Sequence, residues 1–377
     1  MQCFCCKGPI FDAVFLLQRN DIMTTTNHLS VPRIALTFAG SILGAGYLSG
    51  QELMQFFGAF GAKGLLGLFL SMGLLAVLAG MAMLLAKRTG LIELDRIIIP
   101  WEMPLLRRSV AILEAVFLLA TVVIMYAGVG ALLQQLLNLP PWIGSLLMCV
   151  LATVIAMYGL DGTIRFFSLL VPPTVVITVV FGLLAMLILG APVIPEPDAG
   201  NPLLGSFLPS AISFTSYNFF GIIGLLAPIG TLSRSEKTPF RAAALGAGLL
   251  LAIALSILGA MFACPESCEA SLPMLAVAAK LHPLLQYPYA LVLFGGMFGA
   301  ALYGLVTVTT LLEAKSPAFP RYKGRFLVLL ALVSYPASLF GFGDLISVLY
   351  PLIGYCSIAF ILCMVFHYFK ASKAAPN

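Results

Sequence analysis

The sequence predicts an all-α membrane protein whose chain crosses the bilayer ten times, and three observations lead to that prediction. Hydrophobic residues make up 61% of the chain and charged residues only 9%, so a soluble protein of this length would lack the charges that its surface needs. Apolar runs long enough to cross roughly 30 Å of hydrocarbon as helices recur along the chain. These runs also lack the period-two alternation of membrane β-strands.

Ten apolar runs are candidate spanning helices. A helix needs about 20 apolar residues to cross the hydrocarbon layer. The runs cover about 32–58, 63–87, 108–138, 141–159, 164–190, 205–230, 240–263, 284–313, 325–342 and 344–369. The ninth run is short and contains Pro336.

The positions of lysine and arginine indicate the orientation, because these residues gather in cytoplasmic loops. With the N-terminus in the cytoplasm, only Lys63 and Lys280 of the 20 lysines and arginines fall on the outer side. We therefore expect a cytoplasmic tail at each end of the chain, over residues 1–30 and 370–377.

The chain divides into two halves of five spans each, residues 31–190 and 205–369. The linker between them, 191–204, lies within the stretch GAPVIPEPDAGNPLLG, has neither lysine nor arginine, and is expected outside the cytoplasm. Because each half has an odd number of spans, the second half must lie upside down relative to the first. Inverted repeats of this kind are a recurrent plan of transporters, with the binding site at the repeat interface near the bilayer midplane.

The first span contains a glycine-rich stretch that ends in an acid, GSILGAGYLSGQE from Gly40 to Glu52. Glycine in a helix interior costs roughly 1 kcal/mol relative to alanine. Two interpretations are open: the glycines pack against a neighbouring helix, or the helix is interrupted and the break forms a site. For the second interpretation the expected substrate-binding residues are Gly44, Ala45, Gly46, Tyr47 and Ser49.

The sixth span contains the most polar patch within any span, SFTSYNFFG from Ser213 to Gly221. We expect a second interruption here, at the same depth as the first, because paired interrupted helices mark transporter sites. N–H groups of the helix that resumes after Gly46 would bind a carboxylate, and carbonyls freed over 216–220 would accept from an ammonium. The expected substrate-binding residues are Thr215, Ser216, Tyr217 and Asn218.

The first motif, followed half a chain later by SYNFFG, resembles the amino acid–polyamine–organocation superfamily with its LeuT-like fold, and in particular the bacterial YkvI-like family with its GAG-x-x-SGQE and SYN segments. The resemblance covers about residues 31–369. It implies a 5+5 inverted repeat in a bacterial inner membrane, with spans one, two, six and seven rocking against spans three, four, eight and nine. It also implies substrate contacts by Ala45, Gly46 and Tyr47 and by Ser216, Tyr217 and Asn218.

The coupling ion is expected to be a proton or sodium. Sodium-coupled relatives place adjacent hydroxyl residues in the middle of span eight, where this chain has Gly299 and no serine or threonine. Glu52, Glu114 and Gln51 are the coupling or gating candidates. Glu52 is either a protonation site or a brace for the outer half-helix, and Glu114 either a protonation site or a partner of an arginine in its own loop.

Tyr126, near the middle of the third span, is either a substrate neighbour or an ordinary tyrosine of the helix bundle. The eight cysteines do not indicate a disulfide framework, and CFCC at Cys3–Cys6 is compatible with metal binding, lipidation or a reduced tail. Met23 opens MTTTNHLSVPR, which is typical of a natural start, so 1–22 would be an upstream extension. We assign no metal site and no cofactor.

The function expected from these features is secondary active transport of a small organic solute, an amino acid or a related amine or zwitterion. No Walker A motif is present for ATP-driven transport, and the net charge of +5 is not a nucleic-acid signal in a chain of this composition. A channel or a solute sensor is the alternative. A membrane-embedded enzyme is not expected, because its converging acids or histidines are missing: His28, His282 and His367 lie at or beyond the ends of spans.

Overall fold

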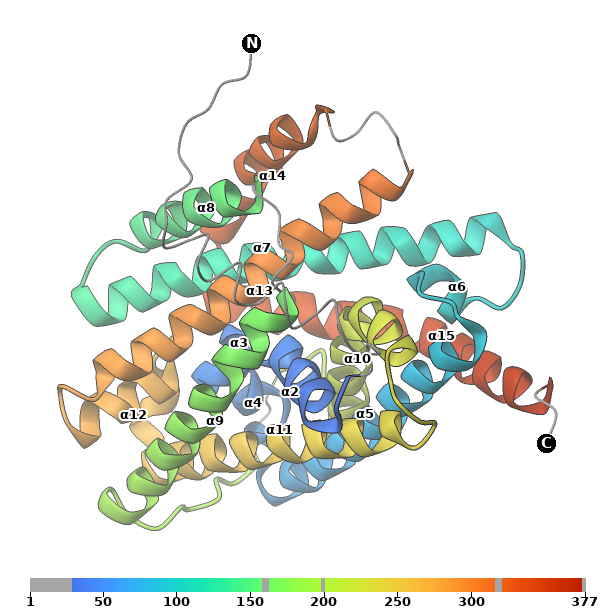
Figure 1. Cartoon of the computed structure of the whole chain (residues 1–377). Coiled ribbons are helices and arrows are strands. Elements are labelled where there is room, and N and C mark those ends of the chain that lie inside the picture. Colours follow the sequence, from blue (N-terminus) through green and yellow to red (C-terminus); the bar gives the residue numbers. More distant parts are fainter. Residues whose placement is uncertain (1–28, 158–162, 198–200, 316–320, 375–377) are drawn as a thin grey trace.

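The structure is a computed structural model that describes residues 29–157, 163–197, 201–315 and 321–374 (Figure 1). Within these residues the regular elements are helices, apart from one isolated bridge between Leu29 and Ser233. The all-α class is therefore confirmed. Most of the expected N-terminal tail, including Cys3–Cys6 and Met23, lies outside the described residues.

The predicted first span is divided into three short helices. They are α2 (Val31–Ile42), α3 (Ala45–Ser49) and α4 (Gln51–Phe56), followed by the 3₁₀ turn η1 (Gly58–Phe60). Leu43 and Gly44 separate α2 from α3. Gly50 separates α3 from α4 with a φ of 86°, a left-handed conformation that glycine adopts without steric cost. The predicted interruption of this span is confirmed.

Each of the other nine predicted spans corresponds to one helix in the described part of the chain. These helices are α5 (Gly61–Thr89), α7 (Pro104–Leu137), α8 (Pro141–Met157), α9 (Thr163–Ile188), α10 (Phe207–Thr231), α11 (Thr238–Ala263), α13 (Gln286–Lys315), α14 (Lys323–Ser338) and α15 (Phe342–Ala374).

Seven helical segments of the described residues are long and apolar enough to cross a membrane, and α2 and α8 are shorter apolar helices. The chain is an integral, multi-pass membrane protein. The ninth span is shorter than predicted: α14 ends at Ser338, and Gly341, with a φ of 102°, turns the chain into α15.

The predicted interruption of the sixth span is wrong, because α10 is continuous from Phe207 to Thr231. Its central polar side chains bond to carbonyls one turn earlier in the same helix. Thr215 donates to Ala211 O at 2.8 Å, and Ser216 donates to Ile212 O at 2.7 Å. Asn218 Nδ2 donates to Phe214 O at 3.0 Å. The polar patch is thus accommodated without unwinding the helix.

Three short helices that were not predicted lie in the connections: α6 (Leu94–Ile98), η2 (Pro265–Glu269) and α12 (Pro273–Leu281). The linker after α9 contacts the end of α11, where Val193 N donates to Phe262 O at 3.2 Å.

The helix α10 lies at the centre of the packing, against α5 and α15, while α7 packs on α8 and α13, and α11 on α2, α5 and α9 (Figure 1). At one end of the molecule Arg88 of α5 bonds Glu236 in the loop after α10 at 2.7 Å. The Arg88 guanidinium lowers the pKa of the Glu236 carboxyl below its usual range.

Candidate functional site

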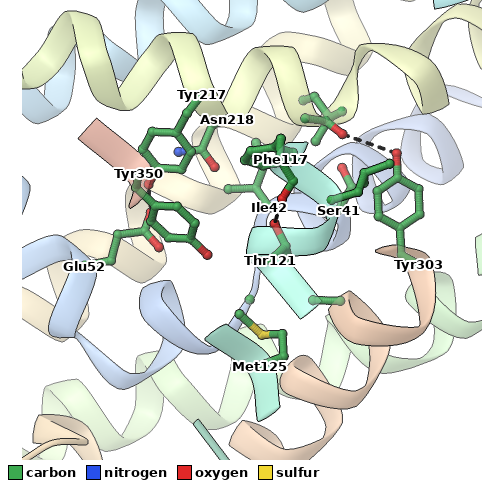
Figure 2. A pocket seen from close by; sticks show the side chains of 15 residues that line it. Ser41, Ile42, Glu52, Phe117, Thr121, Met125, Tyr217, Asn218, Tyr303 and Tyr350 are labelled. Carbon is green, nitrogen blue, oxygen red and sulfur yellow. Dashed lines mark hydrogen bonds between the residues drawn. The ribbon is translucent and has the colours of Figure 1, made fainter. Parts of the chain in front are cut away.

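A buried cavity lies beside Leu43 and Gly44, the first break of the predicted first span, between α2 and α3 (Figure 2). Its volume is about 40 Å³, which is enough for roughly three water molecules. Residues from α2, α4, α7, α10, α13 and α15 line it. They are Ser41, Ile42, Gly44, Glu52, Phe117, Leu118, Thr121, Met125, Tyr217, Asn218, Gly221, Ile222, Ala300, Tyr303 and Tyr350.

Glu52 is the one residue with a formal charge among the described residues that line the cavity. It belongs to α4 and is only 4% exposed. The hydroxyl of Tyr217 on α10 donates to Glu52 Oε1. The other carboxylate oxygen lies over Gly46, where a Cβ would stand 2.6 Å from Glu52 Oε2. Glycine at position 46 therefore leaves the space that this carboxylate occupies.

Aromatic rings surround the carboxylate of Glu52. Tyr350 of α15 stacks on Tyr217 with ring centroids 4.6 Å apart and an interplanar angle of 15°. Phe56 and Phe214 also contact the Tyr217 ring, at 5.5 and 5.6 Å. In Figure 2, Glu52, Tyr217, Tyr350 and Asn218 gather on one side of the cavity. The acid is thus held among side chains from three helices.

Three hydroxyls line the cavity from the other helices (Figure 2), and each donates to a backbone carbonyl. Ser41 Oγ donates to Phe38 O at 2.8 Å, and Thr121 Oγ1 donates to Phe117 O at 3.0 Å. Tyr303 of α13 donates to Gly221 O of α10 at 3.3 Å. A hydroxyl has a single hydrogen to donate, so these three present oxygen lone pairs to the cavity.

Backbone groups at the second break are satisfied by side chains. Tyr289 of α13 donates to Leu48 O at 2.8 Å, and Gln51 N donates to Ser49 Oγ at 3.3 Å. Unsatisfied backbone groups are costly inside a membrane, so these bonds explain how a helix can be broken at Gly50 within a buried core.

Four predicted site residues line the cavity: Gly44, Glu52, Tyr217 and Asn218. Gly46 does not line it but contacts Glu52. Ala45 is buried in α3 beside them, and the Ser49 hydroxyl donates to Gly46 O at 3.2 Å. The structure therefore brings the two predicted motifs together at Glu52 and Tyr217.

The other predicted residues lie away from the cavity. Tyr47 donates to Leu250 O of α11 at 2.7 Å, and Tyr126 faces Cys149 and Thr153 of α8. Thr215 and Ser216 bond within α10, as described above. Gln51 approaches Gly343 at the start of α15.

Glu114 is buried on α7, and it is not among the residues that line the cavity. Its Oε1 lies 3.0 Å from where Gly224 of α10 would carry a Cβ, so Glu114 lies against α10 outside the cavity wall.

Sequence reasoning missed Ser41, Thr121, Tyr303 and Tyr350. A signal existed for Tyr350, which immediately precedes Pro351 inside the last span. For the other three, single polar residues within apolar runs carry no pattern that separates a cavity from ordinary packing.

The N-terminal N–H groups of the helix after the first break were predicted to bind a ligand carboxylate, but the structure does not place them in the cavity wall. The helix resumes at Ala45 rather than after Gly46, and α3 is five residues long. None of its residues Ala45–Ser49 lines the cavity. Because α10 is continuous, no carbonyls are freed over 216–220 to accept from an ammonium. Instead a carboxylate of the chain itself, that of Glu52, faces the cavity.

The fold and the cavity at its broken first helix define an all-α integral membrane protein with the LeuT-like fold. The chain is similar to two proteins of Bacillus subtilis (strain 168), the membrane protein YkvI and the protein YyaD. YkvI is 25% identical over 342 residues, which cover 88% of this chain and 94% of YkvI. YyaD is 25% identical over 336 residues, which cover 88% of this chain and 95% of YyaD. The expected resemblance to YkvI-like proteins is confirmed. No protein-family model matches the chain.

Three solved structures share the fold. MhsT in complex with L-phenylalanine superposes with a TM-score of 0.66 at 16% identity, over 94% of each chain. A manganese transporter of Eremococcus coleocola gives 0.56 at 15% identity. Mhp1, a nucleobase-cation-symport-1 family transporter in a closed conformation with bromovinylhydantoin bound, gives 0.59 at 13% identity. The last two matches each cover 88% of this chain and 78% of the other chain. The LeuT-like fold is confirmed.

Proposed function

We propose that this protein is a secondary active transporter of a small organic solute, an amino acid or a related amine, that works by alternating access in a bacterial inner membrane. The observation that carries the proposal is the buried cavity at the first break of the first helix, with Glu52 in its wall. Irregular backbone at membrane depth is tolerated only where it is buried in protein or lines a cavity. The three solved structures that share the fold are also transporters or hold a small molecule.

The coupling ion in this proposal is a proton at Glu52, with sodium as the alternative. A carboxyl group enclosed by protein alternates between a neutral and a charged form as its surroundings change. The titratable and polar groups that face Glu52 are Tyr47 from α3, Tyr217 and Asn218 from α10, and Tyr350 from α15. These groups carry no positive charge that would hold the carboxylate permanently ionised.

Counterflow in proteoliposomes tests the transport proposal. Liposomes containing the purified protein are loaded with one unlabelled solute from a panel of amino acids and amines, and uptake of the same labelled solute is measured. A carrier gives saturable uptake above the equilibrium level. Flux that does not saturate indicates a channel, and binding without flux indicates a sensor; either result contradicts the proposal.

A substitution of Glu52 distinguishes coupling to a proton from coupling to sodium. In Glu52→Gln the pH dependence of the uptake that remains at saturating solute is expected to disappear, and Glu236→Gln, an exposed glutamate of a loop, is the matched control. Uptake that falls when choline replaces sodium, with an unchanged pH dependence in Glu52→Gln, contradicts the assignment of the proton to Glu52.

A further inference from the structure

The cavity wall offers hydrogen-bond acceptors and few donors. Ser41, Thr121 and Tyr303 donate their hydroxyl hydrogens to backbone carbonyls, and Tyr217 donates its hydrogen to Glu52. Each hydroxyl has one hydrogen, so a ligand in the cavity meets their oxygen lone pairs. The Asn218 amide bonds Phe214 O and also the Glu52 carboxylate, so the side-chain donor left among the described residues of the wall is the hydroxyl of Tyr350.

The charge of the wall favours the same kind of ligand group as its hydrogen-bond acceptors do, namely a cationic donor. Glu52 is the one formally charged residue among the described residues of the wall, and no lysine or arginine of those residues accompanies it. Stacked tyrosine rings, Tyr217 and Tyr350, lie beside the carboxylate, and the faces of aromatic rings attract cations.

A ligand with a carboxylate group fits this wall poorly. A carboxylate only accepts hydrogen bonds, and here it would face the carboxylate of Glu52 and hydroxyl oxygens whose hydrogens are already donated. An ammonium group has three hydrogens to donate and a positive charge. Burying a charged group without partners is costly, so the wall distinguishes these two groups strongly.

From this arrangement we infer that the site selects organic amines that lack a carboxylate, and that Glu52 is the residue that determines this selectivity. The inference rests on the proposed transport function and narrows it from amino acids and amines to amines. The ammonium nitrogen binds between Glu52 and the acceptor oxygens of Ser41, Thr121 and Tyr303. The size of the cavity, about 40 Å³, corresponds to a ligand of roughly three non-hydrogen atoms, and larger amines require the cavity to widen.

The test uses series that each contain an amino acid, the amine that lacks its carboxylate and the acid that lacks its amino group. The small series is ethylamine, alanine and propionate, and the large series is 2-phenylethylamine, phenylalanine and 3-phenylpropionate. Dissociation constants are measured on the purified full chain at pH 7 from ligand-dependent shifts of its melting temperature. We expect the amine of at least one series to bind at least tenfold more tightly than the matching amino acid, and the acids to give no shift.

Variants at Glu52 identify the selective group. In Glu52→Gln the amine is expected to lose at least tenfold in affinity, whereas Glu52→Asp, which keeps the charge, retains the preference for the amine over the amino acid. Glu236→Gln binds like the wild type. The wild-type series needs no variant, so it decides the matter even where Glu52→Gln does not fold.

The possible results test amine selectivity and the transport proposal independently. Amino acids that bind as tightly as the amines and show counterflow would support transport and overturn amine selectivity. Amine binding that is unchanged in Glu52→Gln would overturn the role of Glu52. If none of the six compounds binds, amine selectivity is overturned, whereas counterflow of another amino acid from the wider panel still supports transport.

Discussion

Gly46 shows how one missing side chain shapes the site. Its Cα faces the Glu52 carboxylate so closely that a Cβ would stand 2.6 Å from Oε2 and 3.1 Å from the Cβ of Glu52. Glycine permits that approach because it has no Cβ. The carboxylate is thereby positioned between the first helix and Tyr217 on α10.

The first prediction concerns this contact. Gly46→Ala is expected to destabilise the protein by about 1–3 kcal/mol, because the added methyl group overpacks the site, and to displace Glu52 from Tyr217. Gly73→Ala is the matched control, since a Cβ there meets nothing within 4 Å. Equal melting temperatures for the two variants would show that Gly46 does not hold the carboxylate in place.

At the scale of the element, both the first and the sixth spans were predicted to be interrupted, but only the first is. The first was predicted to break because glycines and an acid gather in it, and glycine at a φ of 86° does end α3 at Gly50. The polar patch of α10 consists instead of serine, threonine and asparagine. Such side chains can bond the carbonyl one turn back in a helix, and Thr215 and Ser216 do so. Composition alone cannot tell this arrangement from a break.

The second prediction tests the bond that compensates for the break at Gly50. Tyr289→Phe removes the donor to Leu48 O and leaves a buried carbonyl without that partner, which is expected to cost about 1–3 kcal/mol of unfolding free energy. Tyr287→Phe, two residues earlier and 52% exposed, is expected to change stability by less than about 0.5 kcal/mol. Thermal or denaturant unfolding in detergent measures both. A Tyr289→Phe variant as stable as Tyr287→Phe contradicts the assignment.

For the whole molecule, apolar run length was sufficient to locate the helices that correspond to the predicted spans; in the described part of the chain, seven helical segments are long and apolar enough to cross a membrane. The LeuT-like fold followed from two short motifs, which the comparisons confirm. The cavity wall was less accessible to sequence reasoning. Tyr303 and Tyr350 come from α13 and α15, far along the chain from Glu52, and only the packing of these helices against α10 and α7 brings the three side chains to one space.

The third prediction concerns the orientation of the molecule, which rests on lysine and arginine positions. A thiol reagent that does not cross membranes is expected to label Glu196→Cys in intact cells and to label Lys373→Cys only after the cells are broken. Both positions are exposed, and the native cysteines are first replaced by alanine. Labelling of Lys373→Cys in intact cells would reverse the orientation.

The continuity of α10 has a mechanical consequence. To bend at its centre, this helix would have to give up backbone bonds together with those of Thr215 and Ser216, whereas the first helix already lacks regular bonding at Leu43–Gly44 and at Gly50. Were the cavity to widen, the first span could bend at its two existing breaks without losing helical bonds, whereas α10 could bend at its centre only by losing them. Both breaks therefore lie in the first half of the chain, and the helix of the second half that lines the same cavity has none at its centre.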